Sequence, residues 1–304
     1  MAAHDTWWAS FWGRSYIEVN RTSWSPPPQP PAPSPPPSPV PSPPPPAPLV
    51  PSLPIDGSTL WLRAKTLGDT YSTGEKVTTW GGPGSMVSQA DEQLAPEFVA
   101  NAFASGAPAV RFDGKGTFLA NKTLQLGETA GTSTHFAVFR DTGSLVSCCS
   151  GVLYWQPGDA CVGISTSQAD PSSPTLAIAD GPGVAVSGSM NVTNRSVIVM
   201  VTYSANGDVA LTVGKCNYTG HYPSPPGKAV GAMVGTRNNE LGRYFKGDIG
   251  EIISYPRVLN ATEQTQIQAY LASQWPSATE AEKADCGSPS PTQADSGFRV
   301  SQMY

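Results

Sequence analysis

The sequence predicts a mainly β protein, an antiparallel β-sandwich or jelly roll with one helix near its C-terminal end. Short apolar runs alternate with Gly, Asn, Asp and Pro, a pattern typical of strands joined by tight turns. Asn206-Gly207 stands between two such runs and predicts a hairpin, because both central positions of the tightest turns require a positive φ. Apolar side chains at helical spacing follow residue 259.

Seven apolar runs are predicted to be strands: residues 60–64, 109–112, 136–139, 151–155, 197–203, 209–213 and 249–255. The helix is predicted at about 260–275, where Asn260 is the N-cap and Glu263 completes a capping box. We expect one face of this helix to pack on a sheet through Ile267, Tyr270, Leu271 and Trp275.

Proline divides the chain into segments. Of its 32 prolines, 18 lie in residues 26–54. Proline lacks a backbone donor and fixes φ near the polyproline II value, so this segment is predicted to be an extended spacer of roughly 90 Å at about 3.1 Å per residue. The predicted organisation is an aromatic-rich head without an assignment (1–25), the spacer (26–54), a globular domain (55–276) and a disordered polar tail (277–304).

Asn-x-Ser/Thr sequons and cysteines indicate a secreted protein. Six sequons predict passage through a glycosylating pathway and N-glycans at Asn20, Asn121, Asn191, Asn194, Asn217 and Asn260. Five cysteines fit an oxidising compartment, and closely spaced residues predict a bridge from Cys161 to Cys149, or alternatively to Cys148. The other interpretation is a cytosolic protein with buried, reduced thiols.

Charge and hydropathy exclude two classes of partner. The net charge is −5 with no Lys/Arg cluster, so nucleic acid is not an expected ligand. No apolar run reaches the roughly 18 residues of a membrane helix. The first residues lack the basic start and apolar core of a signal peptide, so we expect a piece of a larger polypeptide, with a misassigned start as the alternative.

Two families are similar to parts of this chain. The Ser-Pro runs, such as residues 34–37 and 42–46, resemble the hydroxyproline-rich extensins and pherophorins of plant and green-algal cell walls. Residues 60–64 with Val77 and Trp80, and then 106–114 and 245–259 with the following helix, resemble concanavalin A-like, laminin-G-like jelly-roll domains over 55–276. Together these resemblances imply a glycoprotein of the cell wall or extracellular matrix. The jelly-roll family includes lectins, glucanases and adhesion modules, so fold alone does not choose among them.

The resemblance to glucanases can be tested on the carboxylates. Retaining glucanases of that superfamily carry Glu-x-Asp-x-x-Glu on one strand, and this string is absent. The nearest match is Asp248-Ile249-Gly250-Glu251, whose spacing predicts side chains on opposite faces of a strand. His4, His135 and His221 are far apart and suggest neither a triad nor a metal cluster. We therefore predict no catalytic residues and no enzyme, with a glycoside hydrolase as the lesser alternative.

A carbohydrate or glycoprotein ligand is the favoured prediction, with a purely structural wall module as the alternative. Sugar sites combine an aromatic ring with polar side chains, and the candidates are Tyr154, Trp155, Asp159, Arg237, Asn238, Asn239 and Tyr244. The alternative for these residues is a place in the core or in a turn. No cofactor is expected, although Asp113 and Asp248 leave calcium open beside a framework role.

Overall fold

A computed structural model of the protein describes residues 52–82, 84–125, 132–143, 150–156, 162–167, 176–181, 184–221, 230–237, 243–278 and Cys286. The chain divides into units 1–50 and 51–304, and every described residue belongs to the second. The predicted head, nearly all of the spacer and most of the tail lie outside the described residues, so these assignments stay predictions.

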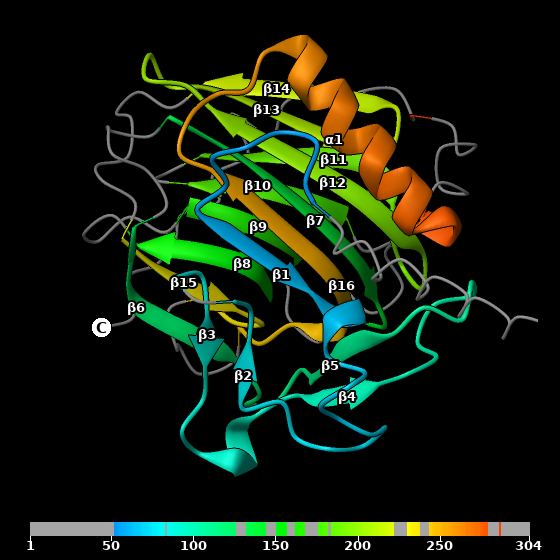
Figure 1. Cartoon of the computed structure of the whole chain (residues 1–304). Helices are drawn as coiled ribbons and strands as arrows, with labels where there is room; N and C mark the ends of the chain where they lie inside the picture. The colour runs from blue at the N-terminus through cyan, green and yellow to red at the C-terminus, as the bar shows by residue number, and fades with distance from the viewer. Residues whose placement is uncertain are drawn as a thin grey trace, which may run out of the picture. The chain divides into compact units, whose positions relative to one another are not determined.

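Two antiparallel sheets of eight described strands each form a sandwich (Figure 1). The first, sheet A, has the order β14-β13-β12-β7-β16-β5-β4, with β1 also paired to β16. Its strands are β1 (Leu60–Arg63), β4 (Glu97–Val99), β5 (Ala109–Asp113), β7 (Ser133–Asp141), β12 (Ser196–Tyr203), β13 (Asp208–Val213), β14 (Cys216–His221) and β16 (Lys246–Tyr255).

The second sheet, sheet B, has the order β11-β10-β9-β8-β15-β6-β3-β2. Its strands are β2 (Thr79–Trp80), β3 (Val87–Ser88), β6 (Leu119–Gln125), β8 (Ser150–Gln156), β9 (Val162–Ser167), β10 (Leu176–Gly181), β11 (Val184–Asn191) and β15 (Val230–Val234). Short 3₁₀ turns are η1 (Ala64–Thr66), η2 (Glu92–Leu94) and η3 (Pro276–Ala278). The seven predicted strands correspond to β1, β5, β7, β8, β12, β13 and β16, and the predicted β-sandwich is confirmed.

The core lies where the inner faces of the two sheets meet. His135 of β7 stacks on Trp155 of β8 with ring centroids 3.8 Å apart. Tyr203 of β12 reaches across the same interior, where its hydroxyl donates to the Gly163 carbonyl over 3.0 Å. Because side chains alternate along a strand, this interior takes every second residue of each central strand. Together with the layer between α1 and the outer face of sheet A, this interior forms one core, whose largest members are Trp80, Trp155, Trp275, Tyr203, Tyr255, Phe112, Phe136, Phe139 and Phe245.

The predicted helix is confirmed as α1 (Ala261–Gln274), which lies against β12 on the outer face of sheet A (Figure 1). Asn260 accepts from the Glu263 backbone N–H over 3.0 Å, and the Glu263 carboxylate accepts from the Asn260 N–H over 2.9 Å, which completes the capping box. Of the predicted stripe, Ile267, Leu271 and Trp275 are buried and Tyr270 is half-buried. None of the described helices has the length and hydropathy needed to span a bilayer.

The predicted hairpin joins β12 to β13, but its turn differs from the expected one. Gly207 has a φ of 91°, whereas Asn206 keeps a negative φ, since Asn194 is the one non-glycine with a positive φ among the described residues. The Gly207 N–H donates to the Ser204 carbonyl, and the Ser204 N–H donates to the Asp208 carbonyl. A four-residue loop with one left-handed glycine therefore replaces the two-residue turn.

A disulfide joins Cys216, the first residue of β14, to Cys286, 70 residues later. The Tyr218 hydroxyl also donates to the Cys286 carbonyl over 3.5 Å, so Cys286 is held beside β14 by two contacts. The predicted bridge of Cys161 with Cys149 or Cys148 lies outside the described residues and stays a prediction.

Candidate functional site

The carboxylates Asp248 and Glu251 lie on the same face of β16, so the prediction of opposite faces is wrong. Asp248 pairs with Arg140 and Glu251 pairs with Val138, two residues apart on β7. The register shifts by one residue between Ile249 and Glu251, which is a β-bulge at Gly250. The extra residue restores the alternation, and both acids face the side of sheet A that carries α1.

Glu251 anchors α1 to the sheet. It has no exposed surface, and its carboxylate accepts from the Trp61 indole N–H over 2.7 Å, the Tyr270 hydroxyl over 2.9 Å and the Trp275 indole N–H over 2.6 Å. Burial raises the pKa of this carboxyl, while these hydrogen bonds act in the opposite direction. Three donors from two elements occupy the carboxylate, which leaves no surface for a substrate.

Asp248 is equally enclosed. It is fully buried, with the Arg111 Nε 2.7 Å from Oδ1 and an Arg140 guanidinium nitrogen 2.5 Å from Oδ2. The other aspartate considered for calcium, Asp113, shapes a turn: its Oδ1 accepts backbone N–H groups of Lys115, Gly116 and Thr117. Within the described ranges no three His, Cys, Asp or Glu side chains gather as a metal site would require.

The structure brings together part of the predicted ligand set. Trp155 is 1% exposed and faces the core, as its alternative interpretation expected. Tyr154, on the opposite face of β8, is also buried, and the Arg237 guanidinium lies over its ring at 5.7 Å. Tyr244 forms isolated β-bridges with Gly151 and with Thr236, and Thr236 directly precedes Arg237 in the chain. Asp159, Asn238 and Asn239 lie outside the described residues, so this ligand site stays a prediction.

Five of the six predicted glycosylation sites are among the described residues, and none of these five asparagines is buried. All the sequon asparagines among the described residues have exposed or half-exposed side chains: Asn121, Asn191, Asn194, Asn217 and Asn260. Asn20 lies outside the described residues. Glycosylation at these positions therefore stays a prediction that the geometry permits.

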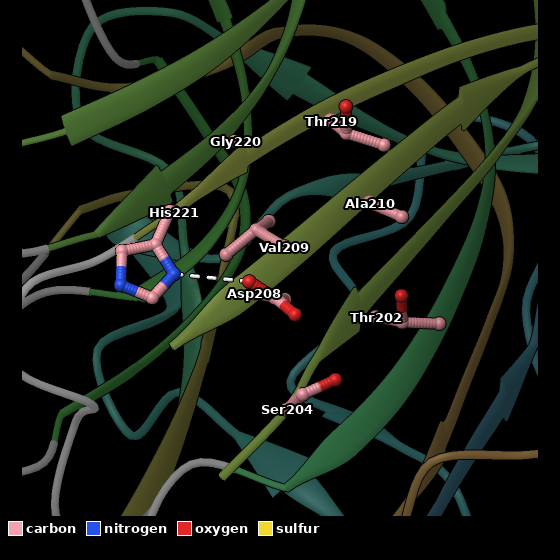
Figure 2. Close-up of a pocket in the computed structure, with 8 residues that line it drawn as sticks. All are labelled: Thr202, Ser204, Asp208, Val209, Ala210, Thr219, Gly220 and His221. Atoms are coloured by element: carbon pink, nitrogen blue, oxygen red, sulfur yellow. Dashed lines mark hydrogen bonds and ion pairs between the residues drawn. The ribbon is translucent and has the colours of Figure 1, made fainter. Parts of the chain in front are cut away.

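A hollow of about 470 Å³ lies on the outer face of sheet A, toward its β14 edge (Figure 2). The register places Thr202, Ala210 and Thr219 side by side on three adjacent strands, and Asp208 directly opposite His221. We call it the β12–β14 hollow; its lining is Thr202, Ser204, Asp208, Val209, Ala210, Thr219, Gly220 and His221.

A hydrogen-bonded pair of an aspartate and a histidine forms one wall of the β12–β14 hollow. The His221 Nδ1 lies 2.9 Å from Asp208 Oδ1, and the Asn206 amide donates to Asp208 Oδ2 over 2.7 Å (Figure 2). The hydrogen bond with His221, and then the one from Asn206, lower the pKa of the Asp208 carboxyl. Asp208 therefore stays an ionised acceptor near neutral pH, and both partners are more than half exposed, with side-chain exposures of 62% and 60%. His221 Nε2 has no partner among the described residues.

A second hollow, of about 780 Å³, lies between β6 and the chain near Met86. Its central side chain, Asn121, is already engaged: Oδ1 accepts from the Thr123 and Leu124 backbone, and Nδ2 donates to the Met86 carbonyl over 2.7 Å. No charged side chain lines it. The β12–β14 hollow is the better candidate because it combines the Asp208–His221 pair with hydroxyls for which the described part of the chain shows no hydrogen-bond partner.

Sequence reasoning missed Asp208 and His221 as a pair because β14 was not predicted. The run Cys216–His221 contains few apolar residues, so it has no strand signal by hydrophobicity. Pairing β13 with β14 through the Gly214-Lys215 turn would have placed the two residues opposite each other, 13 positions apart.

Comparisons with known proteins show similarity at the level of coarse shape. No family model matches the chain, and no curated protein matches it. Domain 4 of the extracellular arabinanase AbnA from Geobacillus stearothermophilus, solved with arabinotriose, is 11% identical with a TM-score of 0.44, over 70% of this chain and 98% of that one. Trypanosoma rangeli sialidase is 16% identical with a TM-score of 0.45, over 75% and 35%.

The botulinum neurotoxin serotype D binding domain is 10% identical with a TM-score of 0.42, over 71% of this chain and 51% of that one. The chain thus spans nearly all of the arabinanase domain but about a third of the sialidase. Identities and TM-scores this low transfer neither ligand nor activity to this chain.

Proposed function

We propose that this chain is a secreted glycoprotein module of a cell wall or matrix that binds carbohydrate at the β12–β14 hollow. The Cys216–Cys286 disulfide supports an oxidising compartment. The accessible sequon asparagines agree with that compartment. The Ser-Pro spacer, read as a rod, would hold the module away from what precedes it.

The observation that carries the ligand class is the Asp208–His221 pair among the hydroxyls of Thr202, Ser204 and Thr219. A sugar offers adjacent hydroxyls that donate and accept at close spacing. Asp208 accepts from such hydroxyls, and the serine and threonine hydroxyls both donate and accept. Because His221 Nδ1–H donates to Asp208, His221 Nε2 accepts when the ring is neutral and donates when it is protonated. A neutral, hydroxyl-rich ligand fits this set better than an anion, which the Asp208 carboxylate would repel.

The proposal includes no catalysis. The two acids that come nearest to a glucanase pattern, Asp248 and Glu251, are buried and engaged by donors of the chain itself. A purely structural module without a ligand is the competing function. A second candidate site for the same function is the cluster of Tyr154, Arg237 and Tyr244 on sheet B, favoured by the guanidinium–ring contact.

The test uses the full chain made with its disulfide in a host that does not N-glycosylate. An array of neutral and acidic oligosaccharides is screened, and binders are titrated by calorimetry. We expect neutral sugars to bind, D208N and H221A to abolish binding, and D69N, a matched change at an exposed aspartate outside the hollow, to leave it unchanged. If no sugar on the array binds, the result supports the structural module without a ligand. If R237A loses binding and D208N keeps it, the binding site is the cluster on sheet B.

A further inference from the structure

The strand that forms the wall of the β12–β14 hollow also carries a glycosylation sequon, Asn217-Tyr218-Thr219. Side chains alternate along a strand, so Asn217, Thr219 and His221 point to the same face of β14. The threonine that completes the sequon is itself part of the lining of the hollow. The acceptor for a glycan and the candidate carbohydrate site thus share one strand and one face.

The Asn217 side chain is exposed, and a hydrogen bond to its Oδ1 orients its amide group. The Thr212 hydroxyl donates to Asn217 Oδ1, which fixes the amide on the outer face of β13 and β14. No described residue bonds Asn217 Nδ2, the atom to which a sugar is attached. Because a strand rises about 3.4 Å per residue, Asn217 lies about 7 Å from Thr219 and about 14 Å from His221 along β14. The first few sugars of an N-linked glycan cover that distance.

We propose that the N-glycan of Asn217 lies along β14 and fills the β12–β14 hollow with its proximal sugars, as an internal ligand that competes with external carbohydrate. In the modification, a glycosyl pyrophosphate donor loses its C1–O bond, C1 bonds to Asn217 Nδ2, and Nδ2 gives up one proton as the pyrophosphate leaves. The competition rests on the proposed function, since it needs a hollow that binds sugar.

Tethering makes even a weak internal ligand effective. A group attached through a short linker has an effective concentration of the order of mM at a site that it can reach. A glycan that fills the hollow nine-tenths of the time leaves about one-tenth of the molecules competent, and weakens the apparent affinity for free sugar about tenfold.

The experiment compares the full chain from an N-glycosylating host with two variants from the same host. N217Q removes the glycan beside the hollow, whereas T262A removes the sequon of Asn260 and leaves the Asn260 cap of α1 intact. Mass spectrometry first measures occupancy at Asn217. The binding probe is N,N′-diacetylchitobiose, the disaccharide of the proximal glycan, and a second readout is the ring resonances of His221, which need no added ligand.

We expect N217Q to bind the probe about tenfold more tightly than wild type and T262A to match wild type. The His221 resonances of N217Q should coincide with those of the chain from a non-glycosylating host, while wild type and T262A differ from them. Wild type and N217Q from the non-glycosylating host should agree, which removes the substitution itself as a cause.

An unoccupied Asn217, or His221 resonances that are equal in glycosylated wild type and N217Q, would overturn the placement of the glycan. Equal affinities of occupied wild type and N217Q would overturn the competition. The His221 resonances of glycosylated wild type and N217Q could differ while neither N217Q nor the non-glycosylated chain binds the probe or any array sugar. That result would support the position of the glycan in the hollow and contradict the proposed binding of external carbohydrate.

Discussion

His135 lies between the two sheets without exposed surface, stacked on Trp155 at 3.8 Å and with Nδ1 2.9 Å from the Ser254 hydroxyl. Its Nε2 has no hydrogen-bond partner among the described residues. Burial lowers the pKa of His135 from 6.5 to about 3, because the imidazolium would lose its hydration in this interior. The native fold therefore holds this histidine neutral.

The sign of the pH dependence follows from that pKa. Below pH 6.5 His135 binds a proton in the unfolded chain, whereas in the folded chain it stays neutral until the pH falls to about 3. The contribution of neutral His135 to the free energy of unfolding is therefore fully present above pH 6.5 and decreases as the pH falls below 6.5. One proton changes the free energy of unfolding by about 1.4 kcal/mol per pH unit. Between pH 6.5 and 5 we expect His135 alone to remove about 2 kcal/mol.

The assay is urea unfolding at several pH values between 7 and 5, on wild type and on H135F/S254A, which removes the imidazole and the hydroxyl that it meets. All other titrating groups are shared, so they cancel in the difference. We expect the pH slope of the variant to be shallower by about 1.4 kcal/mol per unit below pH 6.5. Parallel slopes would refute the reasoning, and H135Q serves as a second variant if the double variant does not fold.

Three further changes probe the packing by urea unfolding. Replacing Glu251 by Gln turns an amide N–H₂ toward an indole N–H and should cost about 1–3 kcal/mol, and an unchanged midpoint would contradict its anchoring role. Gly250→Ala brings a Cβ to 2.7 Å from the buried ring of Trp275 and should cost about 1–3 kcal/mol; a neutral result would show that the bulge can relax. Cys286→Ser opens a loop of 70 residues and should cost about 4 kcal/mol, and reductant should then destabilise wild type by about that much more than the variant.

Strands with a continuous apolar run were predictable from sequence, whereas strands at the margins were not. Val197–Tyr203 is buried along nearly its whole length as β12, because one face meets the core and the other meets α1. The edge strand β14 has one buried residue, Cys216, and carries few apolar ones, so its sequence resembles a loop. Two-residue strands such as β2 and β3 are too short to have a period.

The candidate site could not be predicted because it lies on the edge strand β14, which the sequence did not reveal. His221 has no sequence neighbour that suggests a role, and its partner Asp208 becomes adjacent only through the pairing of β13 with β14. The bulge at Gly250 had a similar effect on Asp248 and Glu251, because alternation predicts faces only while the register is regular. Long-range register, which short-range pattern does not encode, decided both cases.

The disulfide between Cys216 and Cys286 also determines how the protein responds to mechanical tension. Force that enters beyond Cys286 passes straight to Cys216 through the covalent bond, and the segment between them bears no load. That segment contains the central strand β16 and the helix α1. At about 3.4 Å per extended residue, the bond withholds about 240 Å of contour length from stretching. A pulled molecule can thus lose its N-terminal strands while β14, β15, β16 and α1 remain inside a covalent ring.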